Sequence, residues 1–274
     1  MTKLDCEIVE SDVGTKVVRD RTSGETMHPM GAAAEAGQVY VAPSRLEARL
    51  AEGGAPLVLY DVGLGAGSNA IAAWHVSEAL FSAARRLEIV SFEHDLGALR
   101  LALEPEHAAA FGFSPAALLA ANALLRNGLH ESPRTTWRLA FGDFQTRLAE
   151  EPAAAADIVF WDMFSRTANP ELWKASTFRA VRAACRDGAT FFTYHAATST
   201  RAGLLLAGFA VGFGEPTGKQ AQTTVAALNA ADLAKPLDAR WLARLARSSS
   251  PFPIDVLDPS AALAAVRASG QFNT

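Results

Sequence analysis

The chain has 274 residues, of which 50% are hydrophobic and 20% charged, and its formal net charge at pH 7 is −4. This composition is typical of a globular protein with enough apolar material for one large domain or one domain with appendages. The charge balance gives no global signature of nucleic-acid binding, although it is compatible with a local basic patch.

The sequence also bears on compartment and metal chemistry. The two cysteines, Cys6 and Cys185, lie far apart and match no metal-binding spacing, so we expect two free thiols in a reducing cytoplasm and no metal. No apolar run reaches the length of a membrane span, and the N-terminus lacks the apolar stretch of a signal peptide. We therefore expect a cytoplasmic protein without a membrane partner.

Residues 1–50 are predicted to form an appendage of a hairpin and a helix ahead of the main domain. Short β-branched runs within residues 13–28 flank a turn signal at 21–24, which indicates the hairpin. Ser44 follows a proline and can start a helix that runs to about residue 51. His28 precedes Pro29, but we expect it to be a solvent-facing loop histidine rather than a site residue.

The main domain is predicted to start with a strand, a glycine-rich turn and a helix. Residues 57–60 are continuously apolar, as in a strand buried on both faces. The glycines that follow let the backbone approach a ligand, and the helix after them offers free N–H groups and a positive dipole end. The residues of this turn that we predict to contact a cofactor are Asp61, Gly63, Gly65, Gly67 and Asn69.

The spacing of this turn distinguishes two kinds of cofactor. A dinucleotide fingerprint, G-x-G-x-x-G/A, would need Gly or Ala where this chain has Ser68, which disfavours an NAD dehydrogenase. The observed D-x-G-x-G-x-G form is typical of motif I of class I S-adenosylmethionine-dependent methyltransferases. The acid at its start, Asp61, suits the ammonium group of the cofactor's methionine, directly or through water.

Two further strand ends are predicted to bind the adenosine part of the cofactor. Residues 87–92 form a buried strand that ends at Glu93 and His94, where a carboxylate can accept both ribose hydroxyls. A third strand at 135–141 ends at Gly142 and Asp143. We expect this acid to accept a hydrogen bond from the exocyclic amine of adenine.

The fourth and later strands complete the predicted sheet. Strand 158–161 ends at Asp162, and ligands bind outside the carboxyl ends of parallel strands, so Asp162 should face the reactive end of the cofactor. A fifth strand at 190–194 precedes His195, and segments 209–213 and 223–228 form a final strand pair. We predict an α/β, Rossmann-like class I methyltransferase fold with seven mostly parallel strands, the last antiparallel, and helices on both faces. Residues 51–230 would form this domain and 231–274 a helical tail.

The stretch 162–173 carries a resemblance to a known family. Its D-x-F followed by N-P-x-x-W is similar to the D-G-F-x-P-x-x-N-P-x-x-W stretch of MnmC-type methyltransferase domains, and the glycine turn and its helix through Trp74 resemble that family as well. The match covers roughly residues 25–230. The resemblance implies S-adenosyl-L-methionine as cofactor and methylation of the 5-aminomethyl group of the tRNA wobble uridine to 5-methylaminomethyl. The family's FAD-binding oxidase domain is absent from the sequence, so a stand-alone methyltransferase is expected.

Departures from the family pattern lie on the substrate side. Met163 stands in place of Gly, Arg166 in place of Pro, and Ala168 where a basic residue is usual. The late basic cluster is reduced to Lys219. Methyl transfer is therefore better supported than tRNA as the acceptor, and a small-molecule amine or hydroxyl, or a non-catalytic cofactor-binding module, remain as alternatives.

Transfer of a methyl group to an amine is an in-line displacement that depends on positioning a neutral nitrogen. We predict that Asp162 orients this amine by accepting a hydrogen bond and that Phe164 flanks it. Aromatic side chains could hold a base by stacking, although Phe164 and Trp173 suit a core equally well. The residues that we predict to bind substrate are Arg166, Asn169, Trp173, Tyr194, His195 and Lys219. Those that could supply positive charge for tRNA phosphates are Arg166, Lys174, Arg179, Arg201 and Lys219.

Overall fold

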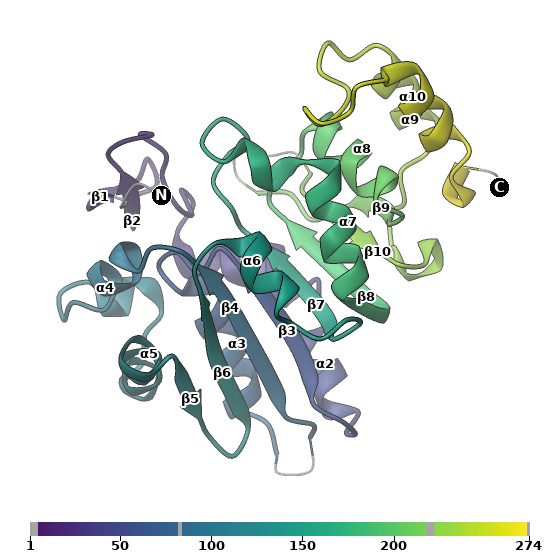
Figure 1. The fold of residues 1–274 in the computed structure, drawn as a ribbon. Helices are drawn as coiled ribbons and strands as arrows, with labels where there is room; N and C mark the ends of the chain where they lie inside the picture. Colours follow the sequence, from purple (N-terminus) through teal and green to yellow (C-terminus); the bar gives the residue numbers. More distant parts are fainter. Residues whose placement is uncertain (1–4, 82–83, 218–221, 273–274) are drawn as a thin grey trace.

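The computed structural model describes residues 5–81, 84–217 and 222–272. A sheet with the strand order β5-β6-β4-β3-β7-β8-β10-β9 lies at the centre of the molecule, and helices cover both of its faces (Figure 1). Its strands are β3 (Leu57–Val62), β4 (Leu87–Glu93), β5 (Leu129–Glu131), β6 (Thr135–Phe141), β7 (Ala156–Trp161), β8 (Cys185–Thr193), β9 (Ala210–Phe213) and β10 (Thr224–Ala227).

The predicted sheet is confirmed, with one addition. Strands β6, β4, β3, β7 and β8 are parallel neighbours, and β10 is antiparallel to both β8 and β9. The eighth strand, β5, was not predicted, because it is a three-residue edge strand that pairs antiparallel with β6. Its short, largely exposed segment carries no hydrophobic pattern of its own.

Two hydrophobic cores, one on each face of the sheet, follow from the alternation of side chains along the strands. Leu57 and Leu59 of β3 belong to the core that includes α3 (Ser68–Glu78), and Val58 and Tyr60 belong to the other core. The helices of the first face are α1 (Ala32–Glu35), α2 (Leu46–Ala51), α3, α4 (Gly97–Ala102) and α5 (Pro115–Asn127). Those that contribute to the second core are α6 (Phe144–Ala149), α7 (Ala175–Ala184), α8 (Thr198–Leu206), α9 (Ala239–Ala246) and α10 (Pro259–Arg267).

A hairpin that we did not predict precedes the predicted one. It pairs β1 (Cys6–Glu10) with β2 (Lys16–Asp20), and its turn is at 11–15. The predicted hairpin around the turn at 21–24 is also present: the side chain of Asp20 accepts hydrogen bonds from Thr22 and Ser23 in the turn, and Arg19 pairs antiparallel with Thr26 across it. The chain beyond this turn reaches the carboxyl ends of the sheet strands, where it helps to line the site.

The C-terminal tail packs into the second core. Trp241 and Leu245 of α9 are buried there, and the carboxylate of Asp255 accepts hydrogen bonds from the first amides of α7. The sequence predicted one helix in this tail, and the structure adds α10. The hairpin and the tail pack into the same cores as the sheet, so these cores do not mark domain boundaries. The predicted division of the chain into domains at residues 50 and 230 stays a prediction. None of the described helices combines the length and apolarity needed to cross a bilayer.

Candidate active site

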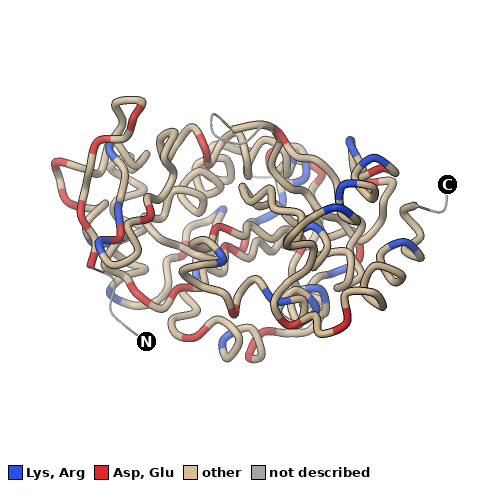
Figure 2. Tube along the Cα trace, turned by 90° about the horizontal axis from the view of Figure 1, so that it is seen from above, with Lys and Arg blue, Asp and Glu red and all other residues tan. Residues whose placement is uncertain are grey.

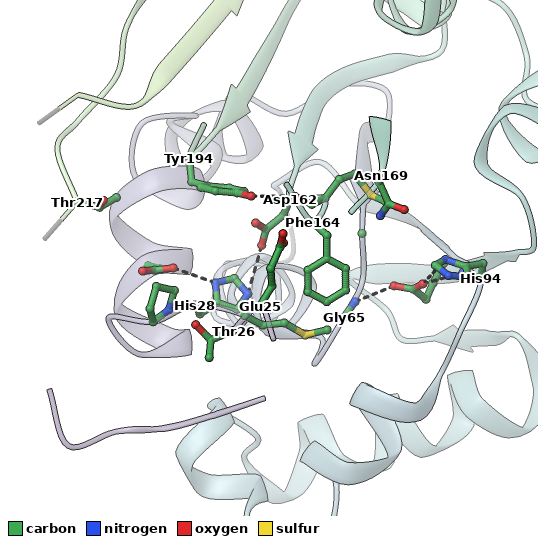
Figure 3. Close-up of a pocket in the computed structure, with 16 residues that line it drawn as sticks. Glu25, Thr26, His28, Gly65, His94, Asp162, Phe164, Asn169, Tyr194 and Thr217 are labelled. Atoms are coloured by element: carbon green, nitrogen blue, oxygen red, sulfur yellow. Dashed lines mark hydrogen bonds and ion pairs between the residues drawn. The ribbon is translucent and has the colours of Figure 1, made fainter. Parts of the chain in front are cut away.

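Two adjoining cavities open at the carboxyl ends of β3, β4 and β7, where ligands bind in open parallel sheets. Their volumes are about 170 and 510 Å³, and they share Glu93, His94, Met163, Phe164 and Asn169 as lining residues. We call the smaller one the inner cavity; the segment 25–29 covers it, and Asp162 and Tyr194 form part of its wall (Figure 3). We call the larger one the outer cavity; residues 142–145 line it.

The glycine turn after β3 is built for close contact. Gly63 has φ +91°, and a Cβ there would lie 2.5 Å from the carbonyl oxygen of Asp162. Gly65 donates its backbone N–H to Glu93 Oε2 at 3.0 Å, which connects the ends of β3 and β4. Gly67, with φ +86°, caps α3. The turn therefore requires glycine for reasons of backbone conformation and space together.

The residues around this turn fit a bound polar cofactor. Three buried polar atoms there, Asp61 Oδ1, Ser68 Oγ and Asn69 Oδ1, have no hydrogen-bond partner among the described residues. Buried polar groups are nearly always paired, so atoms of this kind indicate where a ligand supplies the missing partners. Gly63 and Gly65 line the inner cavity, whereas Asp61, Gly67 and Asn69 are not among the lining residues of either cavity.

Asp61 is buried at the end of β3 and accepts a hydrogen bond from Ser91 Oγ at 2.7 Å. Trp137 Nε1 donates in turn to that hydroxyl at 2.9 Å. Burial, together with the neighbouring carboxylates of Asp162 and Glu93, raises the pKa of Asp61 to about 7, although the Ser91 hydrogen bond opposes this shift. A cation bound nearby would favour the ionised form of this group.

Glu93 and Asp143 occupy the predicted strand ends, but both carboxylates already have partners. Glu93 accepts the backbone N–H groups of Gly65, His94 and Asp95. Asp143 caps α6 by accepting the N–H of Thr146 at 3.0 Å. A carboxylate has about four acceptor positions, so contacts to ribose and adenine are compatible with these bonds and stay predictions.

Asp162 lies at the centre of the inner cavity's polar network (Figure 3). Its Oδ2 accepts a hydrogen bond from Asn69 Nδ2 at 2.7 Å and lies 3.2 Å from His28 Nε2. His28 Nδ1 lies 3.3 Å from Glu35 Oε2. The expectation of a solvent-facing His28 is therefore wrong: its side chain is 8% exposed and bridges two carboxylates.

The wall of the inner cavity is acidic. Glu25, Glu35, Glu93 and Asp162 line it, and none of its described lining residues is Lys or Arg. Glu25 accepts a hydrogen bond from the backbone N–H of Ser165 at 2.9 Å and so ties the segment 25–29 to the loop after β7. A cationic or amine-bearing ligand suits this wall better than an anion does.

The predicted substrate residues divide into two groups. Phe164, Asn169 and Tyr194 line the inner cavity, and the Tyr194 hydroxyl donates to the carbonyl oxygen of Met163 at 3.0 Å. Arg166, Trp173 and His195 line neither cavity. Lys219 lies outside the described residues.

Trp173 is a core residue that supports the site from behind. It is 2% exposed, packs against Trp161 and Phe178, and donates from Nε1 to the carbonyl oxygen of Phe164 at 2.8 Å. The prediction that it contacts substrate is corrected, because its ring faces the second core and its N–H positions the Phe164 loop. From the sequence alone, Trp173 suited a core position and a substrate contact equally well.

His195 and Arg166 also have structural partners. His195 Nδ1 lies 2.8 Å from Thr200 Oγ1, and its ring packs on that of Trp173. Burial, with Arg166 and Arg201 nearby, lowers the pKa of His195 to about 4. Arg166 donates to Ser199 Oγ at 2.6 Å. These contacts place both residues behind the cavity wall.

Arg201 cannot contribute to a phosphate-binding surface as predicted. It is 3% exposed and donates to Thr224 Oγ1 and to the carbonyl oxygens of Gln222 and Thr223. Its guanidinium lies over the ring of Phe213, 4.8 Å from the ring centroid. These contacts hold α8 against the strand pair.

Sequence reasoning missed several lining residues of the inner cavity. Glu25, Met27 and Glu35 come from the segment that was assigned to the appendage. The signal that could have found them is the dense E-T-M-H-P run, in which a proline fixes the chain next to ionisable residues. Among the described residues, one cluster of groups could hold a metal ion, Glu104, Glu106 and His107, and none of these residues lines either cavity.

Comparison with known proteins identifies the family. The model of the S-adenosyl-L-methionine-dependent methyltransferases matches residues 112–229. The chain is 33% identical over 236 residues to the tRNA 5-methylaminomethyl-2-thiouridine biosynthesis bifunctional protein MnmC of Methylibium petroleiphilum, an alignment that covers 82% of this chain and 35% of that protein. The corresponding protein of Burkholderia vietnamiensis is 35% identical over 188 residues, or 66% of this chain and 28% of that protein. The chain thus spans about a third of the length of these relatives.

Solved structures agree with this fold. MnmC2 from Aquifex aeolicus superimposes with a TM-score of 0.74 and 27% identity, covering 96% of this chain and 84% of that chain. Spermidine synthase from Thermotoga maritima has a TM-score of 0.50 and 16% identity, covering 83% and 72% of the two chains. The second likeness concerns the fold alone.

Proposed function

The chain belongs to the S-adenosyl-L-methionine-dependent methyltransferases, and on this basis we propose that it N-methylates the aminomethyl group at position 5 of the tRNA wobble uridine. The observation that carries the proposal is the Asp162 network beside the glycine turn, which offers a hydrogen-bond acceptor to an amine in an acidic cavity. The relatives named for 5-methylaminomethyl-2-thiouridine biosynthesis support the same acceptor. A tRNA acceptor also agrees with the expected cytoplasmic location.

Each part of the site has a role in this reaction. The cofactor supplies an electrophilic methyl group on a sulfonium centre. The turn at Gly63 and Gly65 would hold its methionine part, with Asp61 compensating the ammonium charge from behind. Glu93 would receive the ribose hydroxyls, and Asp143 the adenine amine in the outer cavity.

Asp162 would orient the acceptor. The attacking nitrogen must be neutral, must lie in line with the breaking carbon–sulfur bond, and needs one N–H to point at a fixed acceptor. Asp162 can accept that N–H, while Asn69 holds its other oxygen at 2.7 Å. Methyl transfer would form a carbon–nitrogen bond at the expense of the carbon–sulfur bond that the cofactor brings, and the surplus N–H proton would leave to water. Phe164, on the shared wall of both cavities, would flank the reacting centre.

The charge distribution of the chain supports a polyanionic acceptor. Residues 163–274 carry 12 Lys and Arg against 7 Asp and Glu, whereas residues 1–162 carry 13 against 22. Figure 2 shows blue segments gathered over the half of the molecule that ends at the C terminus. The exposed Arg240 and Arg244 lie four residues apart on α9, and the exposed Arg247 is the C-cap residue of this helix. None of these three arginines forms an ion pair with a described residue.

Methyl transfer from a tritium-labelled cofactor tests the proposal. The acceptor is tRNA that carries 5-aminomethyl-2-thiouridine at the wobble position, and the control is the same tRNA already methylated on that nitrogen. The proposal is supported if the wild type methylates the aminomethyl tRNA and not the control tRNA. Asp162→Ala should lose this transfer and still bind S-adenosylhomocysteine. Cofactor binding without transfer to tRNA would reject this acceptor and favour the alternative, a small-molecule amine or hydroxyl.

A further inference from the structure

The ring of His28 is held between two carboxylates that come from different parts of the chain. Nδ1 lies 3.3 Å from Glu35 Oε2 on α1, and Nε2 lies 3.2 Å from Asp162 Oδ2 after β7. The three side chains are only 8%, 12% and 14% exposed. Each ring nitrogen therefore faces a carboxylate oxygen in a largely buried environment.

This arrangement selects one protonation state. A neutral imidazole carries a single N–H, so one of its nitrogens would direct a lone pair at a carboxylate. The imidazolium donates to both. Burial by itself would lower the pKa of His28, but Asp162, Glu35 and Asp61 outweigh it and raise the pKa above its ordinary value.

The other groups that face this network are acidic or neutral. Glu25 comes from the same segment as His28, and the hydroxyls of Tyr40 and Tyr194 lie near Asp162. No described Lys or Arg lines the cavity. Of the two histidines that line the cavity, His94 pairs with Glu93, so His28 is the one that can balance the carboxylates of Asp162 and Glu35.

The backbone holds His28 in this place. Its φ of +51° is unusual for a residue other than glycine, and Pro29 follows it. Gly31 donates its N–H to the His28 carbonyl oxygen at 2.8 Å, and Met30 donates to Glu35 Oε1 at 3.1 Å. A strained conformation persists only where its surroundings enforce it, and such positions concentrate at functional sites.

Resting on the proposed function, we propose that His28 is a positioning residue that, as an imidazolium, clamps Asp162 and makes turnover depend on its own proton. Together with Asn69 it holds Oδ2, and the carboxylate fixed in this way would accept the N–H of the acceptor amine. Its positive charge also disfavours an ammonium at the same place, and so favours the neutral amine that can attack.

The pH dependence of methyl transfer distinguishes a His28 that acts through its charge from a His28 with a purely structural role. We expect the wild-type rate to rise as the acceptor amine loses its proton and to fall at higher pH as His28 loses its own. His28→Gln keeps a donor but removes the charge, and should lower kcat on the order of 10²-fold and abolish the alkaline fall. Glu35→Gln, which removes a carboxylate that stabilises the imidazolium, should move the fall to lower pH. His107→Gln, at a histidine beside the Glu104 carboxylate on the surface, is the control.

A measurement without acceptor distinguishes failure of the clamp from failure of the proposed function. In protein with ¹⁵N-labelled histidine and bound S-adenosylhomocysteine, NMR should show both nitrogens of His28 protonated at neutral pH in the wild type, and a lower His28 pKa in Glu35→Gln. A neutral His28, or a His28→Gln enzyme with the wild-type pH profile, would overturn the clamp. A protonated His28 in a protein that never methylates tRNA would instead reject the acceptor and leave the clamp standing.

Discussion

At the scale of single residues, Gly63 links the backbone of β3 to the reactive end of the site. A side chain at this position would meet the carbonyl of Asp162 at 2.5 Å and the sulfur of Met163 at 3.0 Å. The glycine thus sets the distance between the cofactor turn and the acceptor loop. This is a steric requirement in addition to its positive φ.

Gly63→Ala should therefore lower the unfolding free energy by more than the positive φ of this position alone predicts. We expect a loss of unfolding free energy of about 1 kcal/mol for the positive φ and a further ~1–3 kcal/mol for the clash, with binding of S-adenosylhomocysteine lost. Gly54→Ala is the matched control, because Gly54 has φ +103° with no atom within 4 Å of a Cβ. Urea unfolding and calorimetry measure the two effects. Equal losses in both variants would contradict the steric argument.

Asp61 predicts a pH dependence of stability in the protein without cofactor. Its pKa of about 7 in the folded state exceeds the ordinary value of 3.8, so between these values the unfolded chain ionises first and folding opposes ionisation. The unfolding free energy attributable to Asp61 should fall as the pH rises from 4 to 7 and stay level above that. The effect is about 1.4 kcal/mol for each unit by which the pKa is raised.

Asp61→Asn should gain stability relative to the wild type over this range, because its amide never ionises. Urea unfolding at a series of pH values measures the difference. Glu131→Gln, which removes a charge from the exposed strand β5, controls for net charge. A difference that does not grow between pH 4 and 7 would show that Asp61 ionises freely.

At the scale of elements, the loop between β7 and α7 is held from two sides. Trp173 fixes the Phe164 carbonyl from the core, and Asp255 of the tail accepts the N–H groups of Ala175 and Ser176 at 2.9 Å each. An acidic cap also interacts favourably with the helix dipole. The tail thereby supports the acceptor side of the site without lining it.

Loss of this cap should weaken both α7 and the attachment of the tail. We expect Asp255→Ala to lower the unfolding free energy by about 1–2 kcal/mol and to speed proteolysis between α9 and α10. Asp258→Ala, which removes the cap of α10 alone, is the comparison. Cleavage of the two variants at the same rate would contradict the idea that Asp255 attaches the tail to α7.

At the scale of the whole molecule, an acidic cavity and a basic C-terminal half would have separate roles in the proposed reaction. The carboxylates around Asp162 suit an amine, whereas the exposed arginines of α9 suit phosphates. A tRNA presents both chemistries, with many phosphates and one aminomethyl group. The combination explains how a chain of net charge −4 could bind a polyanion.

Arg240→Ala with Arg244→Ala should weaken tRNA binding and flatten its dependence on salt, because fewer counterions are released. Binding of S-adenosylhomocysteine should not change. The control is the double variant Arg100→Ala with Arg126→Ala, which removes the same amount of charge from exposed positions of α4 and α5. Titration of labelled tRNA at several salt concentrations measures both pairs, and equal effects would argue against a specific role for α9.

The sequence by itself determined the sheet and the strand ends at which the candidate site lies. Buried parallel strands read as unbroken apolar runs, and their ends are marked by Gly63, Glu93, Asp143 and Asp162. These signals are local, because a strand, its terminal acid and the turn after it are contiguous in the chain. The pairing of parallel strands then brings their carboxyl ends to one edge.

The tertiary structure alone decided what surrounds those strand ends. His28 reaches Asp162 only because the chain after the hairpin crosses the carboxyl ends of the strands, and Trp173 turns into the core because Trp161 and Phe178 are there to receive it. Arg201 is likewise buried by contacts with a distant strand. Local patterns predicted Phe164, Asn169 and Tyr194 of the cavity wall. They could not predict the places of His28, Trp173 and Arg201, because the environment of a side chain depends on residues far away in the sequence.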